Sequence, residues 1–67
     1  MNYNNLTLKD IQQLVDQHKA GWFVESYKGD GKELTIVISK HFIEAGLRYD
    51  TLVFTNIDGK WYVVNKL

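Results

Sequence analysis

The chain of 67 residues contains no cysteine, no proline and only two histidines. Without cysteine it can form neither a disulfide nor a thiolate metal site. With two histidines, a zinc site would have to recruit carboxylates as well. We therefore expect no metal and no cofactor, and the absence of cysteine fits a protein of the reducing cytoplasm.

An excess of charge of either sign is also missing, because eight acidic residues balance the eight basic ones. Tight binding to duplex nucleic acid normally requires a basic domain or a basic stripe, which argues against nucleic acid as the main partner. No apolar run approaches the roughly 18 residues that cross a membrane. The start of the chain lacks the basic-then-apolar order of a signal peptide. These patterns predict a complete cytoplasmic protein without a membrane segment.

The length of the chain limits it to a single domain, residues 1–67, with a small core. At this length folding buries only about 60% of the surface of the unfolded chain. Such short chains commonly gain stability from disulfides, from a metal or from a partner subunit. Since disulfides are excluded and a metal is not expected, self-association is the remaining source of additional stability.

The first predicted element is an amphipathic helix over about residues 8–20. Thr7 is suited to cap its start, with Asp10 as the acid of a capping box, and Gly21 is a natural left-handed stop. One face of this helix is apolar, because hydrophobic residues recur at helical spacing: Leu8, Ile11, Leu14 and Val15.

Two β-hairpins are predicted after the helix, over residues 22–40 and 50–67. Each contains an Asp-Gly pair, typical of a tight turn, between two runs rich in aromatic and β-branched residues. Residues 41–49 between them are predicted to form a short connection or a single helical turn. The expected fold class is therefore α+β, with one N-terminal helix packed on a four-stranded antiparallel sheet.

The register of the hairpins sorts their side chains onto two faces of the sheet. With the turns at the Asp-Gly pairs, Tyr27 lies opposite Leu34, and Phe54 lies opposite Val63. The first face is strongly apolar and is expected to be covered by the helix: Phe23, Tyr27, Leu34, Ile36, Ile38, Leu52, Phe54, Trp61 and Val63.

The second face is also rich in apolar residues, although serine and threonine dilute it: Trp22, Val24, Val37, Val53, Ile57, Tyr62 and Val64. A solvated face of an antiparallel sheet is normally polar, and an uncovered apolar patch usually marks a contact with a partner. We therefore expect this face to bind a protein, either a second copy in a homodimer or another chain. The alternative is that β-branched residues satisfy strand propensity there and stay half exposed.

The residues capable of chemistry do not combine into a catalytic site. His18 fits a partly buried position at the end of the helix. The pair His41 and Glu44 has a helical spacing compatible with an acid–base or metal pair, but a lone pair of this kind is common by chance. Alternation places Glu25 on the apolar face, where a carboxylate would need a partner or would acquire a raised pKa. A position at the margin of the sheet is the simpler expectation for it. We predict no catalytic residue and no small-molecule substrate.

The leading interpretation is a small non-enzymatic protein-interaction module. Seven lysines against one arginine, with five asparagines, suggest an AT-rich coding sequence, as in a phage or prophage accessory protein that modulates a host protein. The first alternative is binding of single-stranded nucleic acid, with Trp22 and Tyr62 stacking on bases and Lys28 and Lys66 contacting phosphates. A small enzyme is the second alternative and the less favoured one.

Overall fold

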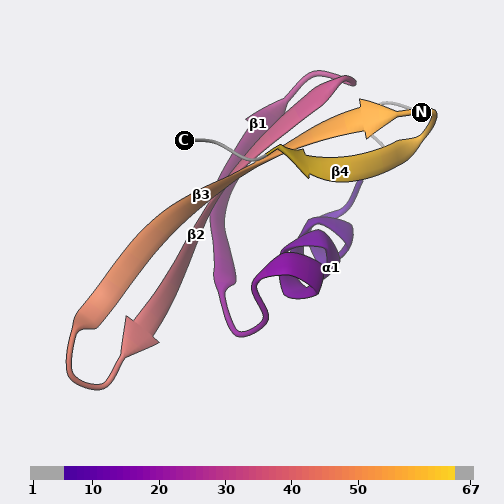
Figure 1. The fold of residues 1–67 in the computed structure, drawn as a ribbon. Helices are drawn as coiled ribbons and strands as arrows, with labels where there is room; N and C mark the ends of the chain where they lie inside the picture. The colour runs from indigo at the N-terminus through magenta and orange to yellow at the C-terminus, as the bar shows by residue number, and fades with distance from the viewer. Residues whose placement is uncertain (1–5, 65–67) are drawn as a thin grey trace.

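The computed structural model describes residues 6–64 as one helix followed by an antiparallel sheet of strand order β1-β2-β3-β4 (Figure 1). The elements are α1 (Leu8–His18), β1 (Phe23–Gly29), β2 (Glu33–Phe42), β3 (Gly46–Ile57) and β4 (Lys60–Val64). This confirms the predicted α+β class. The last residues of the predicted second hairpin, 65–67, lie outside the described part of the chain. Within residues 6–64, no helix has the length and apolar composition needed to cross a membrane.

The start of α1 is held by a complete capping box. The Thr7 hydroxyl accepts the backbone N–H of Asp10 at 3.1 Å, and the Asp10 carboxylate accepts the backbone N–H of Thr7 at 3.0 Å. These two bonds satisfy backbone donors that a helix start otherwise leaves unpaired. The helix ends at His18, two residues before the predicted end, and Gly21 adopts a positive φ of 93° that leads the chain toward β1.

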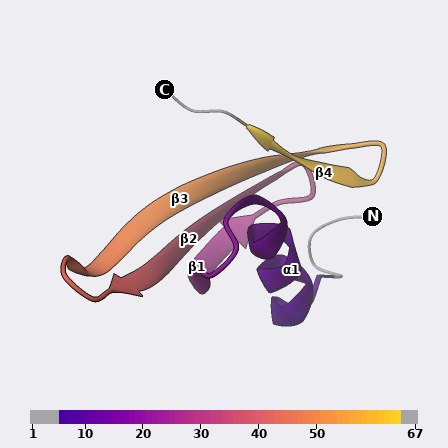
Figure 2. The ribbon, with the colours of Figure 1, turned by 60° about the horizontal axis from the view of Figure 1, so that its bottom comes forward.

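The core lies between α1 and one side of the sheet, which Figure 2 shows facing the helix. Ile11 and Val15 of the helix are fully buried, as predicted from their spacing. They pack in one cluster with buried residues of β2 and β3: Leu34, Ile36, Ile38, Leu52 and Phe54. Leu14 and Trp61 are partly buried against this cluster. Leu8, also predicted for the apolar face of the helix, is instead 57% exposed.

Residues 41–49 differ from the prediction of a short connection or helical turn. Strands β2 and β3 run through this segment and pair continuously from Glu33 opposite Thr55 to Phe42 opposite Gly46. Gly46 supports the turn between them with a φ of 77°. Since the pairing of β1 ends at Ser39, the two strands continue beyond it as a two-stranded arm, residues 40–48, which projects away from the helix (Figures 1 and 2).

The second hairpin has the predicted register, with Phe54 opposite Val63. Asp58 and Gly59 both have a positive φ, at 54° and 86°, as a two-residue turn between twisted strands requires. In the first hairpin, Gly29 rather than Tyr27 lies opposite Leu34. This shift of two residues leaves Tyr27 on the helix side, because side chains alternate with a period of two.

Strand β1 contains an irregularity at Glu25 that the sequence analysis did not anticipate. Ser26 pairs with Val37, but Val24 pairs with Ile38, so that Glu25 is an additional residue in β1. Such a bulge reverses the alternation of the residues before it. The predicted faces were therefore wrong at the start of β1: Trp22 and Val24 pack against the core, whereas Phe23 points away from it and is 66% exposed.

Candidate functional site

The face of the sheet opposite α1, here called the far face, carries many uncovered apolar side chains. Eleven large apolar residues are exposed within residues 6–64. Six of them lie on the far face and come from β1, β3 and β4: Phe23, Leu47, Tyr49, Ile57, Tyr62 and Val64. Because α1 covers the other side (Figure 2), this surface is open to a partner.

Five of the seven residues predicted for the second face do lie on the far face: Val37, Val53, Ile57, Tyr62 and Val64. The structure brings Val53 directly opposite Val64. Val53 is only 5% exposed, so it supports the surface from below and offers little area to a partner. Trp22 and Val24 belong to the core side instead, because of the bulge at Glu25.

Three residues of the far face were missed by the sequence analysis: Phe23, Leu47 and Tyr49. Phe23 was assigned to the wrong face, and the other two lie in the segment predicted as a connection. Phe23 and Tyr49 flank Ser39 in one row across β1, β2 and β3, and Ser39 beneath them is 4% exposed. The alternation of Leu47, Tyr49, Thr51 and Val53 was the signal that could have shown a continuous strand.

Glu25 does not occupy the buried position that regular alternation implied. Its side chain is exposed, and its carboxylate accepts a 2.6 Å hydrogen bond from the hydroxyl of Ser39. The bulge moves Glu25 out of the row between Phe23 and Tyr27, which is why it is not buried. Its role in the fold is to hold the bulge onto β2.

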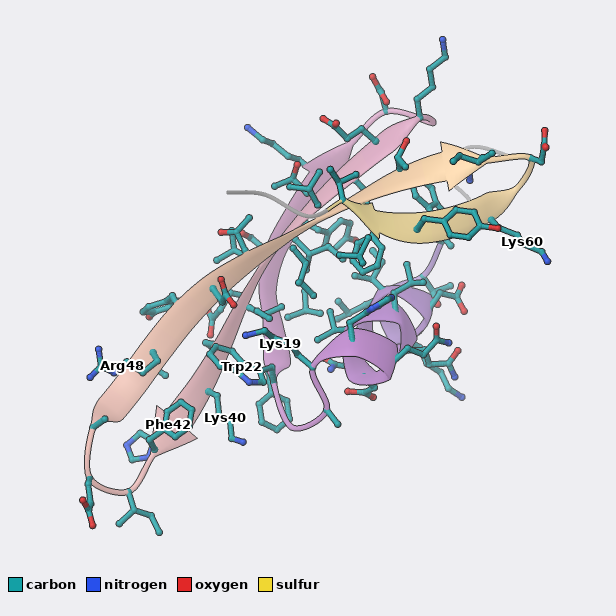
Figure 3. The ribbon with its side chains drawn as sticks, viewed as in Figure 1. Lys19, Trp22, Lys40, Phe42, Arg48 and Lys60 are labelled. Atoms are coloured by element: carbon teal, nitrogen blue, oxygen red, sulfur yellow. The ribbon has the colours of Figure 1, made fainter. Side chains whose placement is uncertain are left out.

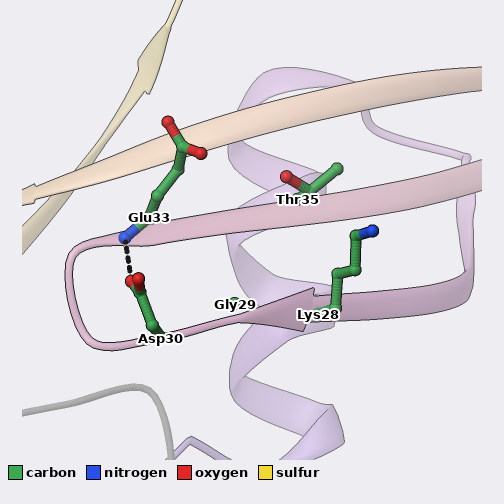
Figure 4. A pocket seen from close by; sticks show the side chains of 5 residues that line it. All are labelled: Lys28, Gly29, Asp30, Glu33 and Thr35. Carbon is green, nitrogen blue, oxygen red and sulfur yellow. Dashed lines mark hydrogen bonds between the residues drawn. The ribbon is translucent and has the colours of Figure 1, made fainter.

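A hollow of about 340 Å³ lies at the end of the first hairpin (Figure 4). Its lining consists of Lys28, Gly29, Asp30, Glu33 and Thr35. Oδ1 of Asp30 accepts the backbone N–H groups of Lys32 and Glu33 at 2.9 and 3.1 Å. These bonds hold the pKa of the Asp30 carboxyl below its ordinary value. An ionised carboxylate engaged with two amides serves the turn, and it is poorly suited to take up a proton from a substrate.

The two histidines are also separated from other reactive groups. The prediction of a partly buried His18 was wrong: the residue is exposed and contacts the Phe54 ring edge-on at 5.3 Å between centroids. His41 is exposed on the arm and Glu44 lies in the turn of the arm, so the helical spacing considered for this pair does not exist. Within residues 6–64, no group of three or more His, Asp or Glu side chains is arranged to hold a metal ion.

The aromatic and basic side chains predicted to bind nucleic acid are not assembled on one face of the sheet. Tyr62 and Lys28 lie on the far face, whereas Trp22 packs against the core on the helix side. Lys66 lies outside the described residues. The stacking platform expected on the second face of the sheet therefore lacks one of its two aromatic side chains.

The chain matches no protein-family model, and comparisons with curated proteins and with solved structures found no match. The geometry of the far face is thus the main source of a functional interpretation.

Proposed function

We propose that the protein is a non-enzymatic interaction module and that a second copy of the chain covers its far face. The observation that carries this proposal is the spread of six exposed apolar side chains over β1, β3 and β4, on the side that α1 leaves uncovered. An exposed apolar surface of this kind marks contact sites on small proteins. A two-fold dimer needs only one such patch, since each copy presents it to the other.

The exposed area supports an interface of ordinary size. Phe23, Tyr49 and Tyr62 are 66%, 61% and 48% exposed. Since an aromatic residue buries roughly 150–250 Å² in a core or interface, these three leave roughly 350 Å² to be covered. A standard interface buries about 800 Å² on each partner. The three aromatic side chains would supply a large share of it, and the aliphatic residues around them would add to it.

The charged residues of the far face lie where an interface needs a polar rim. Lys28, Glu33 and Lys60 are exposed at the end of the sheet that carries the turns after β1 and β3. The apolar residues extend from there across the sheet and onto the arm through Leu47. Interfaces commonly have this order, with charged residues at the edge and aromatic residues at the centre.

The composition supports a further part of the proposal, an accessory role in the cytoplasm of a host cell for a phage or prophage. In this role the dimer would modulate a host protein. The far face would be occupied within the dimer, which leaves the helix of each copy for the host protein.

The oligomeric state tests the proposal directly. Tyr49→Lys places a charge among exposed residues of the far face, and Leu8→Lys is the matched control because Leu8 is 57% exposed on the helix. By sedimentation equilibrium, we expect the wild type and Leu8→Lys to be dimers and Tyr49→Lys to be a monomer. Circular dichroism should show that Tyr49→Lys is folded. If Tyr49→Lys does not fold, Phe23→Lys serves the same purpose. A wild type that stays monomeric over a wide concentration range contradicts the proposal, even if it captures another protein.

A further inference from the structure

On the helix side, a cluster of aromatic and basic residues lies where the arm meets the loop after α1 (Figure 3). Its members come from three segments that are far apart in the sequence: Lys19, Trp22, Lys40, Phe42 and Arg48. No residue of this cluster belongs to the far face. The cluster is therefore independent of the proposed dimer contact.

The aromatic rings and the lysines of this cluster are in direct contact. The Lys19 ammonium lies 4.7 Å from the centroid of the Trp22 ring. The rings of Trp22 and Phe42 meet edge-to-face, with 5.9 Å between centroids. The Lys40 ammonium lies 5.2 Å from the centroid of the Phe42 ring. The two rings thus form a short aromatic strip with an ammonium group at each end.

The geometry of the backbone brings these residues together. Lys40 and Phe42 are two residues apart on β2 and share the helix side of the arm, and Arg48 lies directly opposite Lys40 on β3. Gly21, with its positive φ, lies in the loop between α1 and β1. A Cβ at Gly21 would lie 3.4 Å from the Lys40 ammonium, at ordinary contact distance, so the loop and the Lys40 side chain are adjacent.

The cluster has an excess of positive charge although the whole chain is neutral. Lys19 forms an ion pair with Asp50 at 2.7 Å. Among residues 6–64, neither Lys40 nor Arg48 has a carboxylate within 4 Å. Like charges directly opposite each other on neighbouring strands destabilise a sheet. Bound anions would offset this positive charge.

We infer that this cluster binds single-stranded nucleic acid. Binding sites for single strands combine basic side chains that contact phosphates with aromatic rings on which bases stack. Phe42 is 36% exposed and is available for a base. Lys40, beside the Phe42 ring, and Arg48, which extends from β3 at the other edge of the arm, each offer a contact to a separate phosphate (Figure 3). Arginine adds two parallel donors that match phosphate oxygens. The site differs from the sheet-face platform expected from the sequence.

Tryptophan fluorescence provides a direct measurement of binding. The chain has two tryptophans, so Trp61→Phe leaves Trp22 in the cluster as the single reporter. Titration of this variant with a thymidylate oligonucleotide at low salt should change the Trp22 emission and reach saturation. The logarithm of the affinity should fall with the logarithm of salt concentration, by about 0.7 for each phosphate neutralised. Two basic contacts therefore predict a slope of about −1.4.

Further substitutions in the Trp61→Phe variant separate the contributions of charge and stacking to binding. Arg48→Gln should reduce the magnitude of the slope by about 0.7, and Arg48→Lys should restore it. Lys60→Gln is the matched control, because Lys60 lies on β4 away from the cluster (Figure 3), and it should change nothing. Phe42→Leu should weaken binding roughly 5- to 150-fold at an unchanged slope, since a stacked base is lost.

Two results would overturn the inference. One is an unchanged Trp22 emission when the oligonucleotide is added at low salt to protein that circular dichroism shows to be folded. The other is an equal response to polyglutamate, which would show binding of any polyanion, acidic protein segments included, without recognition of bases. Should Arg48→Gln fail to fold, Lys40→Gln tests the other phosphate contact, and an unchanged slope in a folded variant contradicts the proposal.

Discussion

The buried hydroxyl of Ser39 donates a 2.6 Å hydrogen bond to the exposed carboxylate of Glu25. This bond connects the extra residue of β1 to the strand beside it. The bulge determines which side chains before it enter the core, and through Trp22 it also determines where the aromatic cluster forms. One irregular residue therefore influences both proposed sites.

The reversal of faces at the bulge makes Val24 more important for stability than Phe23. Val24→Ser should lower the free energy of unfolding by roughly 1–3 kcal/mol, because its side chain packs against the core. Phe23→Ser should change it by less than about 0.5 kcal/mol, because Phe23 is 66% exposed. Urea unfolding at low protein concentration, where dimer contacts contribute little, measures both. A regular β1 without the bulge predicts the opposite order.

The side chain of Gln12 joins α1 to the start of β1. Its amide donates to the carbonyl of Trp22 at 2.8 Å, and its carbonyl accepts the N–H of Val24 at 3.1 Å. Gln12→Ala removes both partly buried bonds and should cost about 1–3 kcal/mol. Gln13→Ala is the control, since Gln13 is exposed. Equal stabilities of the two variants in urea unfolding would show that the Gln12 bonds contribute nothing.

The capping box at the start of α1 should be measurable by a single substitution. Thr7→Ala removes the acceptor of the Asp10 N–H and should cost about 0.5–2 kcal/mol. Thr7→Asp should keep the stability close to that of the wild type, because a carboxylate also caps and interacts favourably with the helix dipole. Thermal unfolding of the three proteins checks this order, and identical midpoints would contradict it.

The ion pair of Lys19 with Asp50 should give the stability a dependence on acid pH. The Lys19 hydrogen bond, followed by the backbone N–H of Thr51, lowers the pKa of Asp50 below its ordinary value of 3.8. The stabilisation is therefore present above pH 3.8 and is lost as the pH falls through the pKa of the folded state. Because both side chains are partly exposed, its size should be about 0.2–1 kcal/mol.

Asp50→Asn isolates this contribution from other carboxylates, including Asp30. At neutral pH the variant should be less stable than the wild type, and the two should converge in acid, where Asp50 is protonated. Lys19→Met should show the same convergence. Urea unfolding at a series of pH values measures the difference, and a constant difference down to about pH 2 would mean that the pair is not its cause.

Burial should rank the effects of truncating the apolar face of α1. Ile11 is fully buried, so Ile11→Ala should cost about 2–5 kcal/mol. Leu14 is only partly buried, so Leu14→Ala should lower the free energy of unfolding by less. Leu8 is 57% exposed, so Leu8→Ala should have the smallest effect of the three. A ranking by urea unfolding that places Leu14→Ala above Ile11→Ala would require a different orientation of the helix.

Much of the fold could be predicted because several of its signals are local. Thr7, Asp10 and the spacing of Ile11 and Val15 indicate a helix through contacts within a few residues. The Asp58-Gly59 turn sets the register of the second hairpin in the same way. Five of the seven residues assigned to the second face lie together for this reason, since alternation within β2, β3 and β4 is regular.

The errors arose where a local pattern allows more than one structure. His41 to Gly46 reads equally as a helical turn and as the end of a strand, and pairing with Leu47 and Arg48 selects the strand. Nothing within residues 22–29 marks Glu25 as a bulge, because its partner Ser39 is fourteen residues away. Phe23 and Tyr49 were therefore missed as far-face residues.

The sequence by itself determined the class of fold, the start of the helix and the turn of the second hairpin, because caps, turn residues and hydrophobic spacing act over short distances. Only the tertiary structure decided which face Trp22 and Phe23 occupy and how far β2 and β3 extend. It also decided that Lys19 and Lys40 lie over two aromatic rings. These features depend on the register between strands and on packing of the loop after α1. Both are non-local, and a shift of one residue in pairing is enough to reverse them.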